Sequence, residues 1–463
     1  LFYLYMVRVL FIAPLVVLSL FPLYYIFLKS PPPLPDVDLD AWWGPKELKT
    51  GHDKSIKPFK IKFDVEDLQE RIKRKNKYTP PLEGIAFEYG FNTNQLNSWL
   101  KYWAEEYPFS ERQKFLNQFP QFKTNVQGLD IHFIRVTPKE VPAGVEIVPL
   151  LLLHGWPGSV REFYEAIPLL TAVSKDRSFA IEVIAPSLPG YGFSDAAVRK
   201  GLGATEVAVV FRNLMQRLGF NKYYVQGGDW GSVIGTNLAT LFPNEVLGYH
   251  SNMPFITSPQ VTLISVICSF FPSLIVESKY ADRMYPLSEK YSNLIEEMGY
   301  MHIQATKPDT VGVALTDSPA GLLTYILEKF STWTRPENRQ KVDGGLSFRW
   351  TREKLIDNLM MYWSTKSITT SMRLYAESFN SRHFALRMDE IPTSVPTWFI
   401  QAKNEIAYQP ASLLKFKFTN LLGVTVIEDG GHFLAFELPE VFSVDVLKAI
   451  GVFRKKNSGK TEL

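Results

Sequence analysis

One stretch decides the fold of this chain: Tyr223-Tyr224-Val225-Gln226-Gly227-Gly228-Asp229-Trp230-Gly231-Ser232. The apolar run at its start predicts a short buried strand, and residues 232–239 predict a helix with small side chains on one face. Glycines therefore flank one protruding side chain at a strand-to-helix turn. This pattern is typical of a nucleophile elbow, in which a tight turn exposes the apex side chain above a sheet.

Asp229 occupies the apex, where esterases with the same kind of elbow carry Ser. A carboxylate attacks by displacement at carbon and leaves an ester on the enzyme. The position therefore predicts a nucleophile that accepts an alkyl group. An ordinary glycine-rich turn is the alternative interpretation, because so short a motif also occurs by chance.

The composition is that of a globular protein, with 463 residues, 46% hydrophobic and 21% charged. The length fits an enlarged α/β domain with insertions. The net charge of +3 and the lack of a basic stripe argue against a nucleic-acid surface. Cys268 is the single cysteine, which excludes an intramolecular disulfide and the usual thiolate metal sites.

The first 28 residues are almost wholly apolar, and residues 9–28 carry no charge. Because a helix of about 20 residues crosses a bilayer core of about 30 Å, we expect residues 1–28 to form a membrane anchor. The alternatives are a cleaved signal peptide, which lacks a clear cleavage site here, and a buried core helix. The basic residues that follow the segment favour a cytosolic body.

Residues 29–126 begin with a proline run at 30–35, which predicts an extended spacer. The remainder of this region offers no catalytic constellation. Its apolar residues at helical spacing, such as Leu96, Trp99 and Trp103, indicate helices that pack on a core. We therefore expect a spacer followed by an N-terminal arm.

From residue 129 the pattern alternates between apolar strands and amphipathic helices. This alternation predicts an α/β fold with a mostly parallel sheet and helices on both faces. Residues 127–253 are expected to form its first part and 389–463 its second part. The intervening residues, 254–388, look largely helical, which predicts a lid over the carboxyl ends of the strands, where such sheets bind ligands.

His154-Gly155-Trp156-Pro157-Gly158 directly follows a leucine-rich strand. We expect the backbone N–H groups of Trp156 and Trp230 to form an oxyanion hole, because the second donor follows the nucleophile in this architecture. His154 has no Cys or His at metal-ligand spacing, and is expected to orient the loop.

His432 lies in a glycine-flanked loop just after the last predicted strand. Its place after the nucleophile and an acid predicts the general base. Glu405, the first acid after the strand at 398–401, is the predicted orienting acid. Asp429 is too close to His432 in the chain to hold the ring from behind, and Asp389 precedes the strand. A loop histidine without a role is the alternative.

Taken together, the chain resembles the microsomal-type epoxide hydrolases of the α/β-hydrolase superfamily, and within them is similar to the insect juvenile hormone epoxide hydrolases. The resemblance covers nearly the whole length. It rests on the predicted anchor, Trp42-Trp43-Gly44-Pro45, His154-Gly155-Trp156-Pro157-Gly158-Ser159, residues 227–232, Gly299-Tyr300-Met301-His302, Asp317-Ser318-Pro319-Ala320-Gly321-Leu322 and Gly430-Gly431-His432-Phe433.

The resemblance implies two tyrosines that bind the epoxide oxygen, at positions matching Tyr300 and Tyr375. It also implies a location in the endoplasmic reticulum membrane, contact with lipid through the anchor, and no need for a cofactor or metal. The expected reaction turns lipophilic epoxides into vicinal diols by way of an ester on Asp229. A haloalkane dehalogenase and a non-catalytic hormone-binding protein are the alternatives. The sequence leaves open the substrate, a juvenile hormone or xenobiotic epoxides, and the oligomeric state.

Overall fold

The computed structural model describes residue 24 and residues 29–46, 52–74 and 77–459. The predicted anchor, residues 1–28, therefore lies outside the described residues except for Tyr24. Within the described ranges, no single helix is long and apolar enough to cross a bilayer. One pair, α11 (Pro308–Asp317) and α12 (Pro319–Thr332), bent at 115°, meets that test by length and composition.

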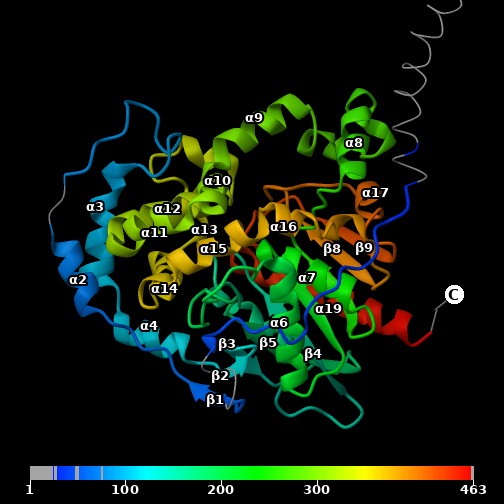
Figure 1. The fold of residues 1–463 in the computed structure, drawn as a ribbon. Coiled ribbons are helices and arrows are strands. Elements are labelled where there is room, and N and C mark those ends of the chain that lie inside the picture. Colours follow the sequence, from blue (N-terminus) through cyan, green and yellow to red (C-terminus); the bar gives the residue numbers. More distant parts are fainter. Residues whose placement is uncertain (1–23, 25–28, 47–51, 75–76, 460–463) are drawn as a thin grey trace, which may run out of the picture.

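Nine strands of the described chain form one sheet in the order β1-β2-β3-β5-β4-β6-β7-β8-β9 (Figure 1). All neighbours from β5 to β9 are parallel, while β1, β2 and β3 join by antiparallel pairs. The expected mostly parallel sheet is confirmed. The strands are β1 (Lys57–Phe59), β2 (Gln121–Val126), β3 (Leu129–Val136), β4 (Glu146–Leu153), β5 (Phe179–Pro186), β6 (Tyr223–Gly227), β7 (Val246–Ser251), β8 (Thr397–Gln401) and β9 (Leu421–Val426).

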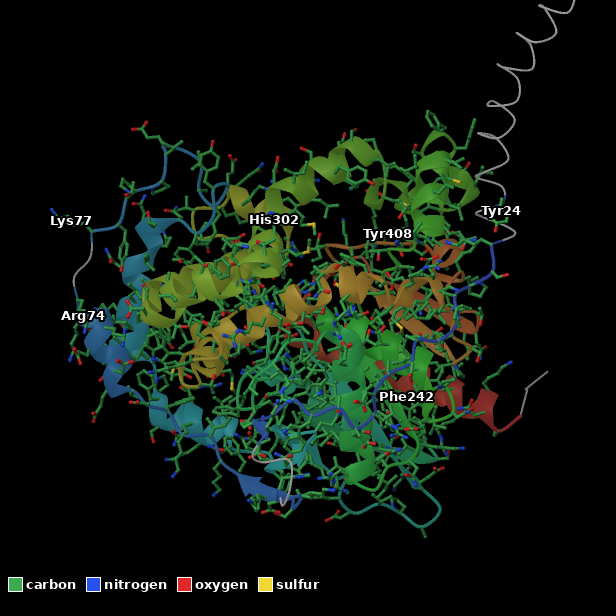
Figure 2. All side chains as sticks on the ribbon, viewed as in Figure 1. Tyr24, Arg74, Lys77, Phe242, His302 and Tyr408 are labelled. Atoms are coloured by element: carbon green, nitrogen blue, oxygen red, sulfur yellow. The ribbon has the colours of Figure 1, made fainter. Side chains whose placement is uncertain are left out.

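Helices cover both faces of the sheet, and side chains fill the space between these layers (Figures 1 and 2). Along β4, Leu151 and Leu153 join the core beneath α6 (Ala204–Arg217) and α7 (Trp230–Leu241). Leu150 and Leu152 join the core beneath α5 (Ala166–Thr171) and α19 (Pro439–Asn457). Because successive side chains of a strand alternate between faces, a continuous apolar run serves both cores.

The sheet begins earlier in the chain than the predicted boundary at residue 127, since β1 and β2 belong to it. Gln127 and Gly128 form the turn of the β2–β3 hairpin, with φ of 51° and 87°. Polar side chains in β2, among them Lys123 and Asn125, weaken the strand signal in the sequence. The other helices of this arm and of the core are α2 (Glu66–Lys73), α3 (Thr93–Lys101), the π-helix η3 (Tyr102–Glu106), α4 (Phe109–Leu116), η4 (Val160–Phe163), α17 (Ala411–Leu414) and α18 (Leu434–Glu437).

A helical insertion separates β7 from β8 and lies above the carboxyl ends of the strands (Figure 1). Its helix α12 contacts α2 and α3 of the arm, and α14 contacts α4. Arm and insertion are thus packed on one another. Besides α11 and α12, the insertion comprises α8 (Pro259–Ile267), η5 (Cys268–Phe270), η6 (Pro272–Leu274), η7 (Ser278–Arg283), α9 (Leu287–Glu297), α10 (Gly299–Thr306), η8 (Pro336–Gln340), α13 (Leu346–Arg349), α14 (Arg352–Trp363), α15 (Ile368–Ser378), α16 (Ser381–Phe384) and η9 (Met388–Glu390).

Candidate active site

Asp229 sits at the turn between β6 and α7, with φ of 49° and ψ of −127°. L residues rarely adopt this conformation, which costs on the order of 1–3 kcal/mol. The turn is tight enough that a Cβ at Gly227 would lie 2.1 Å from the backbone oxygen of Gly231. Asp229 also caps the N-terminus of α7, where the helix dipole stabilises negative charge. The predicted elbow is therefore present, with a strained apex.

The backbone N–H of Trp156 donates a hydrogen bond of 2.7 Å to Oδ1 of Asp229. This contact requires glycine at the preceding position, since a Cβ on Gly155 would lie 2.0 Å from Oδ1. The neighbouring His154 accepts from the N–H of Leu188 at Nε2, and burial lowers its pKa to about 4. The N–H of Trp156, one of the two expected oxyanion-hole donors, thus reaches the Asp229 carboxylate. Trp230, which carries the other expected donor, is the first residue of α7 and directly follows Asp229.

His432 lies between two carboxylates. Its Nδ1 is 2.8 Å from Oε1 of Glu405, and its Nε2 is 3.4 Å from Oδ2 of Asp229. Burial favours the neutral ring, but the charges of Glu405 and Asp229 outweigh it and hold the pKa of His432 well above its usual value. The two carboxylates therefore favour the protonated form of the ring.

The loop that carries His432 is held from below by Glu437 of α18. The Glu437 carboxyl accepts the backbone N–H groups of Gly431 and Phe433, and burial raises its pKa to about 8. On the other side, the indole of Trp333 meets the imidazole edge to face, with ring centroids 4.9 Å apart. These contacts fix the ring in one orientation.

Asp429 and Asp389, which the sequence disfavours as the acid that orients His432, have other partners. Asp429 forms ion pairs with Arg335 and Arg349, and Asp389 accepts the backbone N–H of Thr257. Glu405 lies in the loop that follows β8, four residues after its last residue, and this loop brings it to the histidine.

Tyr300 of α10 and Tyr375 of α15 pack on the two tryptophans that flank the nucleophile. The Tyr300 ring stacks on Trp156 with centroids 5.1 Å apart, and the Tyr375 ring meets Trp230 edge-on at 4.8 Å. The two rings also meet edge to face, with centroids 5.9 Å apart. Burial together with the charge of Asp229 raises the pKa of both hydroxyls well above 10.0. Both side chains are therefore neutral donors close to the carboxylate.

Helix α14 fastens the Trp156 loop to the insertion. The Asn358 amide donates to the carbonyl of Pro157, and the Tyr362 hydroxyl donates to that of Gly158 at 2.6 Å. The Ser159 hydroxyl donates to the Asn358 carbonyl oxygen. No sequence signal identified these residues, because the contacts join segments about 200 positions apart.

Next to this loop, the buried carboxylate of Asp357 binds two guanidinium groups and a phenol. Arg161 of η4 and Arg112 of α4 approach it at 2.8 and 2.5 Å, and the Tyr107 hydroxyl donates at 2.8 Å. One carboxylate thereby joins the core, the arm and the insertion. Pairing of this kind is required, because an unpaired buried charge is strongly destabilising.

A small cavity lies beside the nucleophile and leaves about 10 Å³ for the centre of a water molecule. Its polar walls are Asp229, His432, His154, Asn252 and Glu162, and its remaining walls are Leu153, Gly155, Trp156, Phe163, Gly228, Phe433 and Ala435. Sequence reasoning missed Glu162. Its position four residues after Gly158, in the same turn as the predicted oxyanion loop, is the signal that was available.

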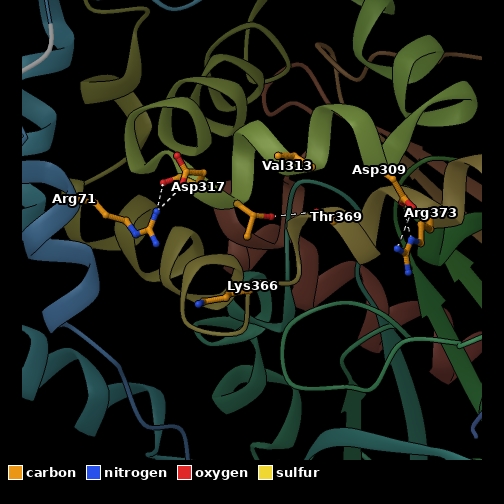
Figure 3. Close-up of a pocket in the computed structure, with 8 residues that line it drawn as sticks. Arg71, Asp309, Val313, Asp317, Lys366, Thr369 and Arg373 are labelled. Atoms are coloured by element: carbon orange, nitrogen blue, oxygen red, sulfur yellow. Dashed lines mark hydrogen bonds and ion pairs between the residues drawn. The ribbon is translucent and has the colours of Figure 1, made fainter.

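A separate depression on the outer surface of α11 and α15 does not belong to this site (Figure 3). Four of its five charged side chains form two ion pairs: Arg71 pairs with Asp317 at 2.5 Å, and Arg373 pairs with Asp309 at 2.8 Å. The chemistry is concentrated around Asp229, where a carboxylate, two phenol donors and an imidazole with its own carboxylate partner meet. This set suits displacement at a carbon that carries an oxygen leaving group, followed by hydrolysis of the resulting ester.

Two family profiles match the chain. The family described as epoxide hydrolase N terminus matches residues 56–163, and the alpha/beta hydrolase fold matches residues 148–439. Over 99% of this chain and 100% of the relative, the sequence is 70% identical to the juvenile hormone epoxide hydrolase of Bombyx mori. It is also 44% identical to epoxide hydrolase 1 of Oryctolagus cuniculus, over 90% of this chain and 93% of that protein.

Solved structures of epoxide hydrolases are also similar to this chain. The crystal structure of the Bombyx mori juvenile hormone epoxide hydrolase covers 91% of this chain and 100% of its own, with a TM-score of 0.90 at 70% identity. The structure of the Aspergillus niger epoxide hydrolase covers 86% of this chain and 97% of its own, with a TM-score of 0.71 at 26% identity.

Proposed function

Because the chain belongs to the epoxide hydrolases of the α/β-hydrolase fold, we propose that its physiological substrate is a juvenile hormone. The chain is an epoxide hydrolase, and epoxide hydrolases convert epoxides and water to vicinal diols. The observation that carries the choice of substrate is the 70% identity to the Bombyx mori enzyme, which extends over 99% of this chain. Xenobiotic epoxides are the second candidate, favoured by the 44% identity to the rabbit enzyme.

In the first step we assign the attack on an epoxide carbon to Oδ2 of Asp229. The other oxygen, Oδ1, is engaged by the N–H of Trp156. As the carbon–oxygen bond breaks, Tyr300 and Tyr375 bind the epoxide oxygen, and one phenol gives it a proton. The hydroxyalkyl ester that forms is neutral, so Asp229 no longer raises the pKa of His432. The imidazolium then returns its proton to the tyrosinate and becomes a base.

In the second step His432, held by Glu405, takes a proton from water as the oxygen attacks the carboxyl carbon of Asp229. The negative charge that develops on Oδ1 is stabilised by the N–H of Trp156 and, in our assignment, by that of Trp230. Release of the diol alcohol regenerates the Asp229 carboxylate and the imidazolium. Atoms and protons balance over the cycle, which consumes one epoxide and one water.

The paired phenols favour this reaction over that of a haloalkane dehalogenase, which needs donors for a departing halide rather than a proton for an alkoxide. The hydrogen-bonded Glu405–His432 pair beside Asp229 argues against a binding protein without turnover. We further propose that residues 1–28 anchor the enzyme in the endoplasmic reticulum membrane with its body in the cytosol. The support is the uncharged run at 9–28 and the basic residues that follow it.

The substrate assignment is tested with the purified full chain by measuring kcat/KM for a juvenile hormone and for a panel of aryl and alkyl epoxides. We expect the hormone to be preferred by at least about tenfold, which corresponds to about 1.4 kcal/mol of transition-state binding. Equal or lower kcat/KM for the hormone would assign the enzyme to xenobiotic epoxides instead.

A further inference from the structure

Residues 254–276 contain no charged side chain over 23 positions. They include α8, η5 and η6 at one end of the insertion. An apolar helix of a soluble protein is normally buried, yet only Val261 is buried in α8 and no residue is buried in η6. Ile256, Val261, Cys268 and Val276 are buried, but the other large apolar side chains of the segment are half-buried or exposed.

Six large apolar side chains of this segment are exposed. We call them the apolar patch: Phe255 (45% exposed), Val266 (42%), Ile267 (44%), Phe270 (79%), Phe271 (66%) and Leu274 (73%). Single exposed apolar residues are common on proteins, but a contiguous group marks a surface that contacts a partner or a membrane.

The patch lies where the predicted anchor joins the body. Lys29, the residue after the anchor, forms an ion pair of 2.9 Å with Glu390. The adjacent Asp389 accepts the backbone N–H of Thr257, which leads into α8. Lys29 is thus bound to the body before the proline run begins, so a bilayer that holds the predicted anchor would lie close to α8.

We propose that the apolar patch inserts into the headgroup region of the bilayer and forms a second membrane contact. The inference rests on the proposed anchor. Lipid is the occupant because exposed apolar side chains on an uncharged stretch, near a predicted segment long enough to cross a bilayer, match the interfacial mode of binding, in which an apolar face enters by about 5–10 Å. The contact fixes the orientation of the body, which the anchor alone leaves free to rotate.

The test places a fluorescent label on the full chain in phosphatidylcholine vesicles. Cys268, the one native cysteine, is replaced by Ser, and the label is attached to Phe271→Cys or to Val444→Cys. Val444 is the matched control: it is also 66% exposed, on α19, which Figure 1 places away from α8. Turnover of a soluble epoxide verifies that each labelled protein is folded.

We expect lipids with a spin label on the acyl chain to quench the fluorescence of the label at 271 by more than half and that of the label at 444 only a little. Iodide in the water should instead quench the label at 444 strongly and the label at 271 little. A vesicle-bound chain whose label at 271 is quenched by iodide overturns the patch and leaves the anchor standing. Protection from both quenchers overturns it in favour of a second copy or of residues 1–28 as the occupant. A chain that does not float with vesicles overturns anchor and patch together.

A different observation concerns the cavity beside Asp229. Its size, about 10 Å³ for a water centre, is the space that one water molecule requires. Gly158 makes room for the Glu162 carboxyl, because a Cβ there would lie 1.5 Å from Oε1. Glu162 thus lies against the cavity, in the space that Gly158 leaves open.

We infer that Glu162 positions the water that hydrolyses the ester. One hydrogen bond to His432 leaves a water free to rotate, whereas a second one to Glu162 directs its lone pair to the carboxyl carbon of Asp229. Burial raises the pKa of Glu162 to about 8, against the opposing charge of His432, so near neutral pH the group can also donate. The inference deepens the proposed mechanism and depends on its second step.

The test is a pre-steady-state comparison of Glu162→Gln and Glu162→Ala with Glu165→Gln, a carboxylate of the same turn that pairs with Arg161. We expect Glu162→Ala to slow ester hydrolysis by about 10- to 100-fold with unchanged ester formation, so that kcat and KM fall together and kcat/KM is preserved. Glu162→Gln, which keeps a hydrogen-bonding group, retains more activity. An equal loss in both steps, or none, overturns the assignment; a wild-type chain that forms no ester overturns the proposed mechanism itself.

Discussion

The Nδ1 atom of His432 lies 2.8 Å from Oε1 of Glu405, and each side chain is only 2% exposed. In so dry a setting the charge of one group controls the protonation of the other. The pKa of His432 is raised well above its usual value by Glu405 and by Asp229. Formation of the ester removes the Asp229 charge and lowers that pKa, so the ring becomes a base at the step that needs one.

Glu405→Gln is expected to change the pH dependence of ester hydrolysis. Hydrolysis requires neutral His432, so its rate rises with pH up to the pKa of the ring in the ester and is constant above it. Loss of the Glu405 charge lowers this pKa, which moves the midpoint to lower pH. The plateau falls by about 10- to 100-fold, a part of the 10²–10⁴ that general-base catalysis supplies. Single-turnover rates from pH 5 to 10 measure both; a midpoint that stays or rises contradicts the assigned pairing.

His432→Gln is expected to stop the enzyme at the ester. The attack by Asp229 does not use the imidazole as a base, whereas water activation does, so turnover falls by about 10²–10⁴ while ester formation persists. Mass spectrometry of the peptide that contains Asp229 should show the added mass of one substrate. His302→Gln, an exposed residue of α10, serves as the control and should turn over normally. An inactive His432→Gln enzyme without adduct is the contrary result.

A single turnover in heavy-oxygen water is expected to place the label in Asp229. The water oxygen joins the carboxyl carbon, and the bond to Oδ2 breaks as the diol leaves. Mass analysis of the same peptide after one turnover detects the label. Label that appears only in the diol means that water attacks the epoxide directly.

Tyr300→Phe and Tyr375→Phe are each expected to slow ester formation by roughly 10- to 100-fold, because each removes one of two donors to the epoxide oxygen. Ester hydrolysis should change little. Tyr223→Phe provides a matched control, since its buried hydroxyl has no hydrogen-bond partner among the described residues. The readout is the rate of ester formation in rapid-quench experiments. A larger effect on hydrolysis than on ester formation would reassign the phenols.

Asp357→Asn is expected to lower the free energy of unfolding by about 3–5 kcal/mol, because it leaves the buried guanidinium of Arg161 without its full countercharge. Asp317→Asn breaks an exposed pair with Arg71 and should cost less than about 1 kcal/mol. Urea unfolding of both variants gives the comparison. Equal effects would show that the Asp357 cluster contributes no more than a surface ion pair.

Local patterns in the sequence were sufficient for the parallel strands, the elbow and the residues that follow strand ends. Asp229, Glu405 and His432 could be chosen because each lies in the loop that follows a strand, and parallel strands bring their carboxyl ends to one edge. Glu162 and the residues of α14 could not, since their roles depend on contacts between distant segments. The polar strand β2 escaped notice because a strand near the sheet edge needs no apolar run.

The attachment of α14 to the Trp156 loop determines which part of the molecule can move. Rotation of the whole insertion about its connections to β7 and β8 would separate Asp357 from Arg112 and Arg161. The buried charges of this cluster would then be left unpaired, which is strongly destabilising. Fluctuation of α8 and α9 breaks far less, because α8 buries Val261 alone and α9 buries no residue. The α8–α9 end of the insertion is therefore held by fewer buried contacts than the part that packs around Asp229.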